Sequence, residues 1–105
     1  MYVSILQRMH YYTSMTKIDV KLVKFGIIFF KQPASLHYDQ NQIELYDINN
    51  DLKFSSPTNE IKYVEFNPIN GMLTLRSKNR QHCNITFVDN RSAEEFQDFI
   101  SGYIK

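Results

Sequence analysis

The spacing of apolar residues changes once along this sequence, and the change limits the folds that the chain can adopt. From Ile18 onward, apolar and polar residues alternate in short runs, which is typical of strands with one buried face. After Asp89 the spacing becomes helical, with apolar residues on one face at Phe96, Phe99, Ile100, Tyr103 and Ile104. We therefore expect a strand-rich body that ends in one amphipathic helix over residues 92–104.

The alternating runs are short and are separated by turn-forming residues. They predict about seven strands, over residues 18–23, 36–38, 43–45, 52–54, 60–66, 73–75 and 83–87. Gly26 predicts a bend after the first strand, and Pro33 predicts a break before the second. Pro57 indicates an edge or a corner of the sheet, because its nitrogen has no hydrogen to donate. Ile61 and Val64 both face inward on one strand, which requires a bulge.

The start of the helix is predicted at Ser92. Ser92 and Glu95 have the spacing of a capping box, in which the serine hydroxyl accepts from a first-turn amide and the carboxylate accepts from the amide of the cap. The apolar face of this helix is expected to cover the open end or face of a small sheet or barrel.

The composition fits one globular domain. A chain of 105 residues with 43% apolar residues can bury one modest core but cannot hold two domains. The 12 basic and 11 acidic residues give a formal net charge of +1, so no global field attracts nucleic acid or an anionic membrane. We expect no nucleic-acid partner and no transmembrane segment, since the longest apolar run covers only residues 25–30.

Cys83 is the single cysteine, so the chain cannot form an intramolecular disulfide. Small secreted domains usually depend on several disulfides, which favours a reducing, cytoplasmic location for this protein. The first residues also lack the charged start, continuous apolar run and cleavage site of a signal peptide.

Residues 1–15 fit the strand pattern poorly. One face of a short helix is indicated by the spacing of Tyr2, Ile5, Leu6 and Met9. Three interpretations stay open: a loosely packed helical extension, a swapped or partner-docking segment, or a start placed too far upstream, with Met15 as the true initiator. The chain is accordingly divided into an N-terminal extension over 1–15 and a domain over 16–105.

The order of several segments over about residues 18–105 is similar to that of a known superfold. These segments are Ala34–Asp39, Ile43–Asp47, Ile61 with Val64, Leu73–Leu75, Ile85–Phe87 and the closing helix. Their order resembles the pleckstrin-homology-like superfold, and more narrowly its GRAM-type and short bacterial members. The resemblance implies a mostly β fold, α+β by element count. It would be a barrel of about seven antiparallel strands in two nearly orthogonal sheets, closed at one corner by the C-terminal amphipathic helix.

The sequence departs from the better-known eukaryotic members of this superfold in two places. Their helix carries a tryptophan, for which Phe96 or Phe99 would substitute here. Their basic inositol-phosphate cluster between the first two strands is absent from this chain. The resemblance therefore does not imply phosphoinositide binding.

The residues that could support catalysis or metal binding are dispersed. His10, His37 and His82 lie far apart, and His82 and Cys83 are expected on opposite faces of one strand. A catalytic or metal site needs several polar groups that converge, and this chain offers no such spacing.

One segment imitates a calcium loop without meeting its requirements. Asp47, Asn49 and Asp51 have the spacing of the first ligands of such a loop. Leu52, however, replaces the required glycine, and Thr58 replaces the bidentate glutamate. With no glycine-rich phosphate loop and no nucleophile elbow either, we expect no metal, no cofactor and no enzymatic activity.

Basic residues concentrate in one predicted hairpin. Arg76, Lys78 and Arg80 are the candidate ligand-binding residues, because their charge-assisted hydrogen bonds could hold a phosphate, a lipid headgroup or an acidic peptide. If the strand continued to Lys78, then Arg76 and Lys78 would share its outer face, with Arg80 at the tip. The alternative interpretation is a solvated hairpin whose charges protect a sheet edge from pairing.

Two hypotheses for the function follow. The first is a small non-enzymatic binding or adaptor module that docks a protein or peptide partner, one version of which is self-association through a sheet edge. The second is peripheral membrane or lipid-headgroup binding through the basic hairpin Arg76–Arg80, which would place the cytoplasmic protein at the membrane surface.

Overall fold

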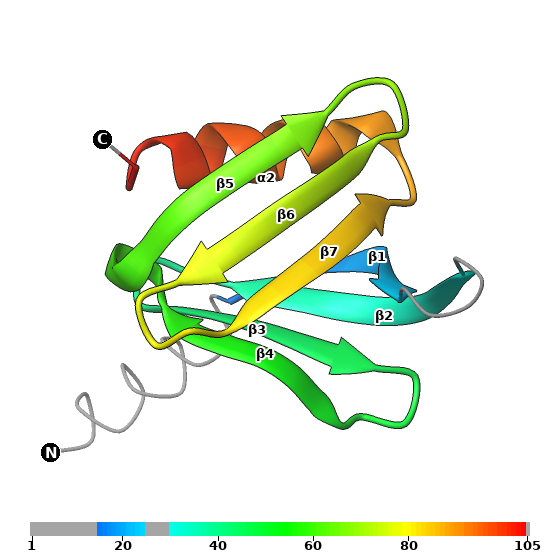
Figure 1. Ribbon diagram of the computed structural model, residues 1–105, viewed down its shortest axis with the longest axis horizontal. Helices are drawn as coiled ribbons and strands as arrows, with labels where there is room; N and C mark the ends of the chain where they lie inside the picture. Colours follow the sequence, from blue (N-terminus) through cyan, green and yellow to red (C-terminus); the bar gives the residue numbers. More distant parts are fainter. Residues whose placement is uncertain (1–14, 25–29, 105) are drawn as a thin grey trace, which may run out of the picture.

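The computed structural model describes residues 15–24 and 30–104, and Figure 1 shows their arrangement. Within these residues the chain forms seven strands: β1 (Thr16–Lys24), β2 (Phe30–Tyr38), β3 (Gln42–Asp47), β4 (Leu52–Pro57), β5 (Ile61–Asn67), β6 (Met72–Ser77) and β7 (His82–Phe87). A short 3-10 helix, η1 (Thr58–Glu60), joins β4 to β5, and helix α2 (Asn90–Ser101) follows β7. The prediction of about seven strands followed by one helix is confirmed.

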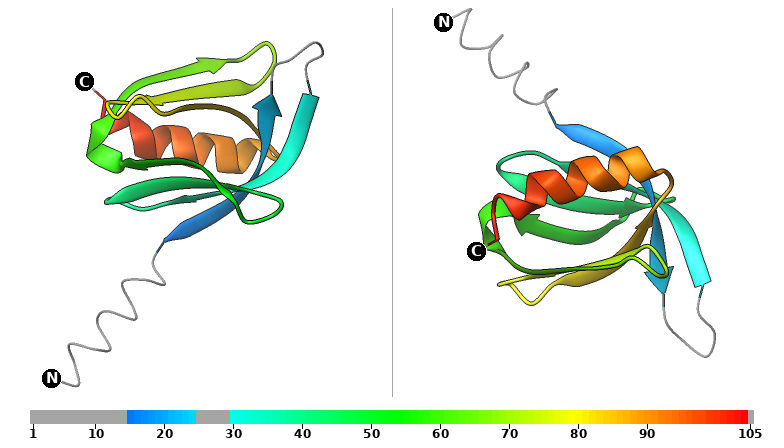
Figure 2. Two further views of the ribbon diagram at one scale, coloured as in Figure 1. Left: turned by 60° about the horizontal axis from the view of Figure 1, so that its bottom comes forward. Right: turned by 90° about the horizontal axis from the view of Figure 1, so that it is seen from above.

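All seven strands belong to one antiparallel sheet with the order β4-β3-β2-β1-β7-β6-β5. Strand β1 connects the two halves, because it pairs with β2 along its whole length and with β7 over Val20–Leu22. The sheet curls into a half-barrel in which β4 and β5 remain as the two edges. Figure 2 shows α2 lying across the open side between the two halves.

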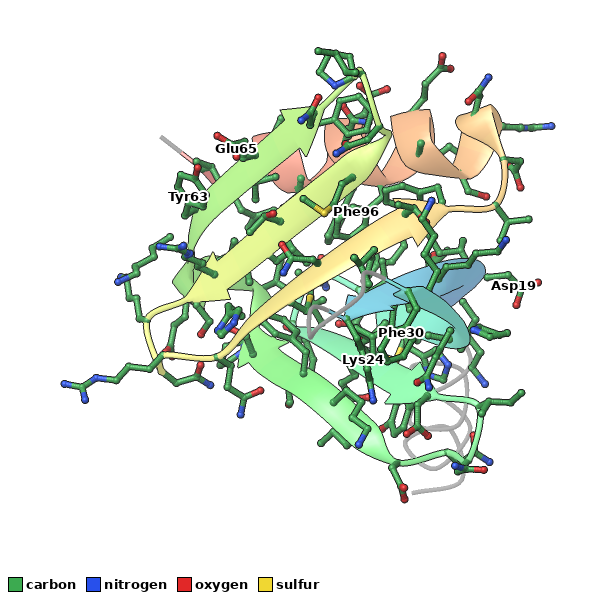
Figure 3. All side chains as sticks on the ribbon, turned by 45° about the vertical axis from the view of Figure 1, so that its right-hand side comes forward. Asp19, Lys24, Phe30, Tyr63, Glu65 and Phe96 are labelled. Atoms are coloured by element: carbon green, nitrogen blue, oxygen red, sulfur yellow. The ribbon has the colours of Figure 1, made fainter. Side chains whose placement is uncertain are left out.

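The interior of the half-barrel is apolar. Its fully buried apolar strand residues are Leu36, Ile43, Leu45, Phe54, Leu73, Leu75 and Ile85. Helix α2 adds Phe96, marked in Figure 3, and Ile100, which are 0% and 2% exposed. The Phe96 ring packs edge-on against Tyr38, with 4.9 Å between the ring centroids. Of the two residues expected to replace a helix tryptophan, Phe96 is fully buried and Phe99 only partly.

Helix α2 begins before the predicted position. Its N-cap is Asp89, whose carboxylate accepts a hydrogen bond from the backbone N–H of Ser92 at 2.7 Å. The predicted capping box is wrong, since the Glu95 carboxylate accepts from the Arg91 side chain at 3.2 Å. An aspartate cap satisfies a first-turn amide and also places negative charge at the positive end of the helix dipole, which favours the earlier start.

The C-terminal end of α2 also differs from the prediction. The helix ends at Ser101, with Gly102 as its C-cap, whereas the apolar spacing predicts an end at Ile104. Ile104 nevertheless packs against the core. The helical spacing therefore identified a shared buried face correctly, although the last of these residues follows the helix.

Two predicted strand irregularities are confirmed and one is wrong. The β5–β6 pairing shifts register between Ile61 and Tyr63, which is the predicted bulge. Strand β4, which ends at Pro57, is an edge of the sheet. Pro33 does not break the chain but lies inside β2. Pairing of β2 with β3 starts only at Ala34, so β2 has an unpaired side at Pro33, where a missing amide hydrogen is tolerated.

Some predictions concern the remainder of the chain. The bend at Gly26 and residues 1–14 of the predicted extension lie outside the described residues. Within the described ranges, no helix has the length and the hydropathy that a membrane crossing requires.

Candidate functional site

Arg76 and Arg80, two of the predicted ligand-binding residues, line the same shallow hollow next to the turn between β6 and β7. Lys62 of β5 and His82 of β7 also line this hollow, which has a volume of about 380 Å³. Arg76 lies opposite Tyr63 in the β5–β6 pairing, and its guanidinium carbon is 5.3 Å from the centroid of the Tyr63 ring. This cation–π contact holds the charge of Arg76 over β5.

Tyr63 also interacts with Glu65 on the same strand, and Figure 3 shows the two side chains next to each other. A side-chain hydrogen bond with Glu65 raises the pKa of Tyr63, with smaller contributions from desolvation and from the charge of Glu65, whereas Arg76 lowers it. The phenol of Tyr63 therefore stays protonated at neutral pH.

The third predicted residue, Lys78, lines a different hollow. Strand β6 ends at Ser77, so Lys78 lies in the turn and does not extend the outer face that holds Arg76. The backbone N–H of Lys78 donates to the carbonyl oxygen of Glu60 at 2.9 Å. Its side chain lines a hollow of about 510 Å³ between the start of β5 and the C-terminal end of α2, together with Lys62.

Lys62 is a candidate residue that the sequence analysis missed, although it lines both hollows. Its exposed position follows from its charge and its place next to the inward-facing Ile61, which is the only signal in the sequence. Its place between Arg76 and Lys78 depends on the register of β5 against β6 and on the bulge after Ile61, which local patterns do not show.

We call this region the basic end and define it by four cations: Lys62, Arg76, Lys78 and Arg80. In the described part of the chain, ion pairs join Lys53 to Asp47 at 3.5 Å and Arg91 to Glu95 at 3.2 Å. Neither pair involves the basic end. Its four cations therefore form no ion pair with a carboxylate of the described residues and can attract an external anion.

The turn between β6 and β7 also covers the edge strand β4. The Gln81 side-chain oxygen accepts from the Ser55 backbone N–H at 2.7 Å, and the Asn79 side-chain nitrogen donates to the Ser55 carbonyl at 3.1 Å. Strands β6 and β7 are themselves paired on both sides. Edge protection by this hairpin thus acts on β4, through two amide side chains and not through its charges.

The other edge strand, β5, borders an apolar groove. This β5–α2 groove has a volume of about 330 Å³ and is lined by Val64, Phe66, Gln97, Ile100, Ser101 and Ile104. The first two are alternate residues of β5, and the other four have helical spacing along and just after α2. The sequence analysis assigned Val64, Ile100 and Ile104 to inward faces and missed the groove, because only the curled sheet brings the two elements together.

The β5–α2 groove and the basic end are continuous. Ile104 lines both the groove and the hollow that contains Lys62 and Lys78. Lys62 in turn lines the hollow that contains Arg76 and Arg80. The surface along β5 therefore changes from apolar at the end of the strand to basic at its start.

The arrangement nearest to a catalytic one lies on β2 and β3. His37 Nε2 is 2.8 Å from Ser35 Oγ, and the His37 ring lies 4.9 Å from that of Tyr46. Glu44 is opposite His37 in the strand pairing. Partial burial and the charge of Lys17 lower the pKa of His37, whereas Glu44 raises it. None of these side chains lines the three hollows described above, so the pair has no substrate pocket among them.

The remaining reactive side chains do not form a cluster. Within the described ranges, no group of three or more His, Cys, Asp or Glu residues comes together to hold a metal ion. His82 is exposed and Cys83 is buried, which confirms that they lie on opposite faces of β7. Desolvation raises the pKa of Cys83 to about 12, so its thiol is protonated and unreactive at neutral pH.

Comparison with known proteins identifies the architecture. No protein-family model matches the sequence, and no curated protein matches it. Among solved structures, the PH domain from TgAPH is similar with a TM-score of 0.56, over 80% of this chain and 78% of that one, at 15% sequence identity. This chain has a pleckstrin-homology-like fold.

Proposed function

We propose that this chain is a non-enzymatic module that docks an extended peptide segment of a partner protein along β5. The observation that carries the proposal is the outer edge of β5, with which no strand of the described residues pairs, beside the β5–α2 groove. A free strand edge offers backbone hydrogen bonds to an added strand, and a neighbouring groove accepts alternate side chains of that strand.

The chemistry of the groove selects apolar side chains. Val64 and Phe66 are only half-buried, although both pack against the core, and Ile104 is half-buried too. A peptide that covers them removes apolar surface from water, at about 25 cal/mol for each Å². The backbone bonds to β5 would fix the direction of the peptide, and the groove would contribute the hydrophobic part of the affinity.

The proposal is tested with random peptides displayed on phage and selected on the full chain. Binding of the selected peptides is then measured by fluorescence anisotropy for the wild type and for Ser101→Tyr, which fills the groove. We expect Ser101→Tyr to weaken binding at least about tenfold, the equivalent of about 1.4 kcal/mol. Asp98→Tyr is the matched control, because Asp98 is also exposed on α2 but does not line the groove.

Two further outcomes decide the mode of docking. Peptides methylated on alternate backbone nitrogens should lose affinity, since they cannot donate to β5. Equal binding by wild type and Ser101→Tyr would contradict the proposal. A chain that dimerises in sedimentation equilibrium, and loses its dimer in Ser101→Tyr, would show instead that the occupant of the groove is a second copy.

Lipid-headgroup binding is the second candidate function. It is supported by the cations Arg76, Lys78 and Arg80, which form no ion pair within the described residues. Its test is sedimentation with phosphatidylcholine vesicles that do or do not contain phosphatidylserine. Pelleting that requires phosphatidylserine, and that is lost when all three residues are changed to Ala, would favour a location at the membrane surface. Pelleting unaffected by these changes would exclude this role for the hairpin.

A further inference from the structure

The position of the basic end relative to the β5–α2 groove restricts the ligand further. Strand β5 runs from Ile61 to Asn67, with Lys62 near its start and Val64 and Phe66 further along. A strand added to β5 in antiparallel orientation would pass Phe66 and Val64 first and Lys62 afterwards. The residues of the peptide that follow its apolar segment would therefore reach the basic end.

The antiparallel orientation has a physical reason. Every strand pair in this sheet is antiparallel, so the local twist and strand direction already suit that geometry. Antiparallel pairing is also slightly more stable per residue than parallel pairing. The C-terminal side of the peptide is therefore the side that meets the cations.

The cations are distributed on both sides of the path of the peptide. Lys78 lines the hollow toward the end of α2, and Arg76 and Arg80 line the hollow next to the β6–β7 turn. Lys62 belongs to both hollows. Successive residues of an extended peptide point to opposite sides, so two or more consecutive acidic residues would place carboxylates in both hollows. A single carboxylate would reach only one.

The distribution of apolar side chains argues against a membrane at the basic end. The exposed aliphatic residues Ile48, Leu52, Ile69 and Val88 belong to the β3–β4, β5–β6 and β7–α2 connections and to the start of β4. Figure 1 shows these connections at the end of the molecule away from the β6–β7 turn. Stable attachment to a lipid surface generally combines basic charge with apolar insertion. At the basic end the exposed Tyr63 ring is engaged with Arg76, and the exposed aliphatic side chains are separated from the cations.

We infer that the peptide bound in the β5–α2 groove carries a run of acidic residues on the C-terminal side of its apolar segment, and that the basic end binds this run. The inference rests on the proposed function, because the same peptide must occupy the groove. It adds the chemical class of the ligand and its direction along β5.

The experiment uses three phage libraries selected on the full chain. Each library joins a random segment to a fixed tail: a C-terminal run of four Glu, a C-terminal run of four Gln, or an N-terminal run of four Glu. Each selected random segment is then synthesised with each of the three tails. The affinities of these peptides are measured by fluorescence anisotropy at low and high NaCl. Wild type is compared with Lys62→Gln/Lys78→Gln and with Arg76→Gln/Arg80→Gln. Lys21→Gln/Lys31→Gln is the control, since these two lysines are exposed elsewhere.

We expect the C-terminal Glu tail to increase affinity about tenfold over the Gln tail at low salt, from three or four partly exposed ion pairs. The increase should shrink in high salt and in both basic-end variants but not in the control. Equal affinity for Glu and Gln tails would overturn this inference and leave the groove intact as a peptide site.

Other outcomes are equally decisive. An advantage for the N-terminal Glu tail would show the opposite direction and overturn the inference. Binding of phosphatidylserine vesicles that requires the same cations, with no effect of an acidic peptide tail, would assign the basic end to lipid. If Ser101→Tyr weakens the binding of no peptide selected from any of the libraries, then both the proposed function and this inference fail.

Discussion

Phe96 is the side chain that attaches α2 to the half-barrel. It is fully buried, and its ring lies 4.9 Å from that of Tyr38 and 6.0 Å from that of Phe87, measured between centroids. Phe99, by contrast, is partly buried and packs on Tyr38 at 4.7 Å. The two phenylalanines have similar sequence contexts, but only the structure separates their contributions.

Phe96→Ala is expected to lower the free energy of unfolding by about 3–5 kcal/mol, through lost burial and the cavity that remains. Phe99→Ala should cost only about 1–2 kcal/mol, because part of its surface already contacts water. Urea denaturation followed by circular dichroism measures both values. A larger loss for Phe99→Ala than for Phe96→Ala would contradict this packing of the helix.

Cys83 makes the stability of the protein sensitive to alkaline pH. Burial raises its pKa to about 12 in the folded chain, whereas an unfolded thiol has a pKa of about 8.5. The folded state therefore keeps a proton that the unfolded state loses. The contribution of this group to stability is complete below about pH 8.5 and is lost as the pH rises toward 12.

From pH 8 to pH 10.5, the free energy of unfolding should fall by about 2–3 kcal/mol more in the wild type than in Cys83→Ala. Urea titrations of both proteins at the two pH values give this difference, and the comparison cancels the effect of the tyrosines. Parallel pH profiles of the two proteins would show that the thiol is more accessible to water than the structure indicates.

At the scale of elements, the two edges of the sheet are treated differently. Asn79 and Gln81 satisfy the outer backbone of β4 at Ser55, whereas within the described residues β5 has no partner on its outer side. Free strand edges promote pairing with other chains, so proteins usually cover them. The contrast supports a binding role for β5.

Asn79→Ala/Gln81→Ala should uncover the edge of β4. The backbone amide of Ser55 is expected to exchange with deuterium at least about tenfold faster, and stability should fall by about 1 kcal/mol for the lost hydrogen bonds. Amide exchange measured by NMR tests this, with Gln40→Ala in the β2–β3 turn as the control. Unchanged exchange at Ser55 would mean that the two amides do not protect this edge in solution.

The strands and the helix could be predicted from the sequence because burial acts on each element locally. Leu36 and Leu73 must face inward whatever their neighbours are, and this requirement produces the alternation. The cap at Asp89 was missed because Asp89 and Ser92, three residues apart, are both suited to be the N-cap. Local preference ranks Asp and Ser as nearly equal at this position.

The candidate site was predicted only in part, because it depends on contacts between distant segments. Arg76 and Arg80 do line one hollow, but Lys78 turns away at the end of β6. Lys62 joins them through the β5–β6 register, and Val64 meets Ile104 only because the sheet curls toward α2. Register and curvature are properties of the whole sheet, so no local pattern contains them.

For the whole molecule, a net charge of +1 conceals an uneven surface, on which basic and apolar side chains gather at opposite ends. Cations without an ion pair in the described part of the chain lie around the β6–β7 turn, and exposed aliphatic residues lie on the connections at the far end. Local charge of this kind can accelerate the association of an acidic ligand even when the total charge is small, and the acceleration falls with ionic strength.

The proposed division of the chain into an extension over 1–15 and a domain over 16–105 gives a prediction at this scale. Among the described residues, the buried core runs from Val20 to Ile100, and Ile18 and Ile104 pack against it. The division predicts that a chain starting at Met15 folds alone, with a melting temperature within about 2 °C of the full chain, a change well below 1 kcal/mol.

Thermal denaturation and two-dimensional NMR of both chains test this division. Superimposable amide resonances for residues 30–104 would show that the domain does not need the first fourteen residues. A fall of about 5 °C or more would contradict the division, because it corresponds to the loss of about 1 kcal/mol of stabilising contacts. Peptide affinity measured on the short chain would then also show whether the leading residues compete for the β5–α2 groove.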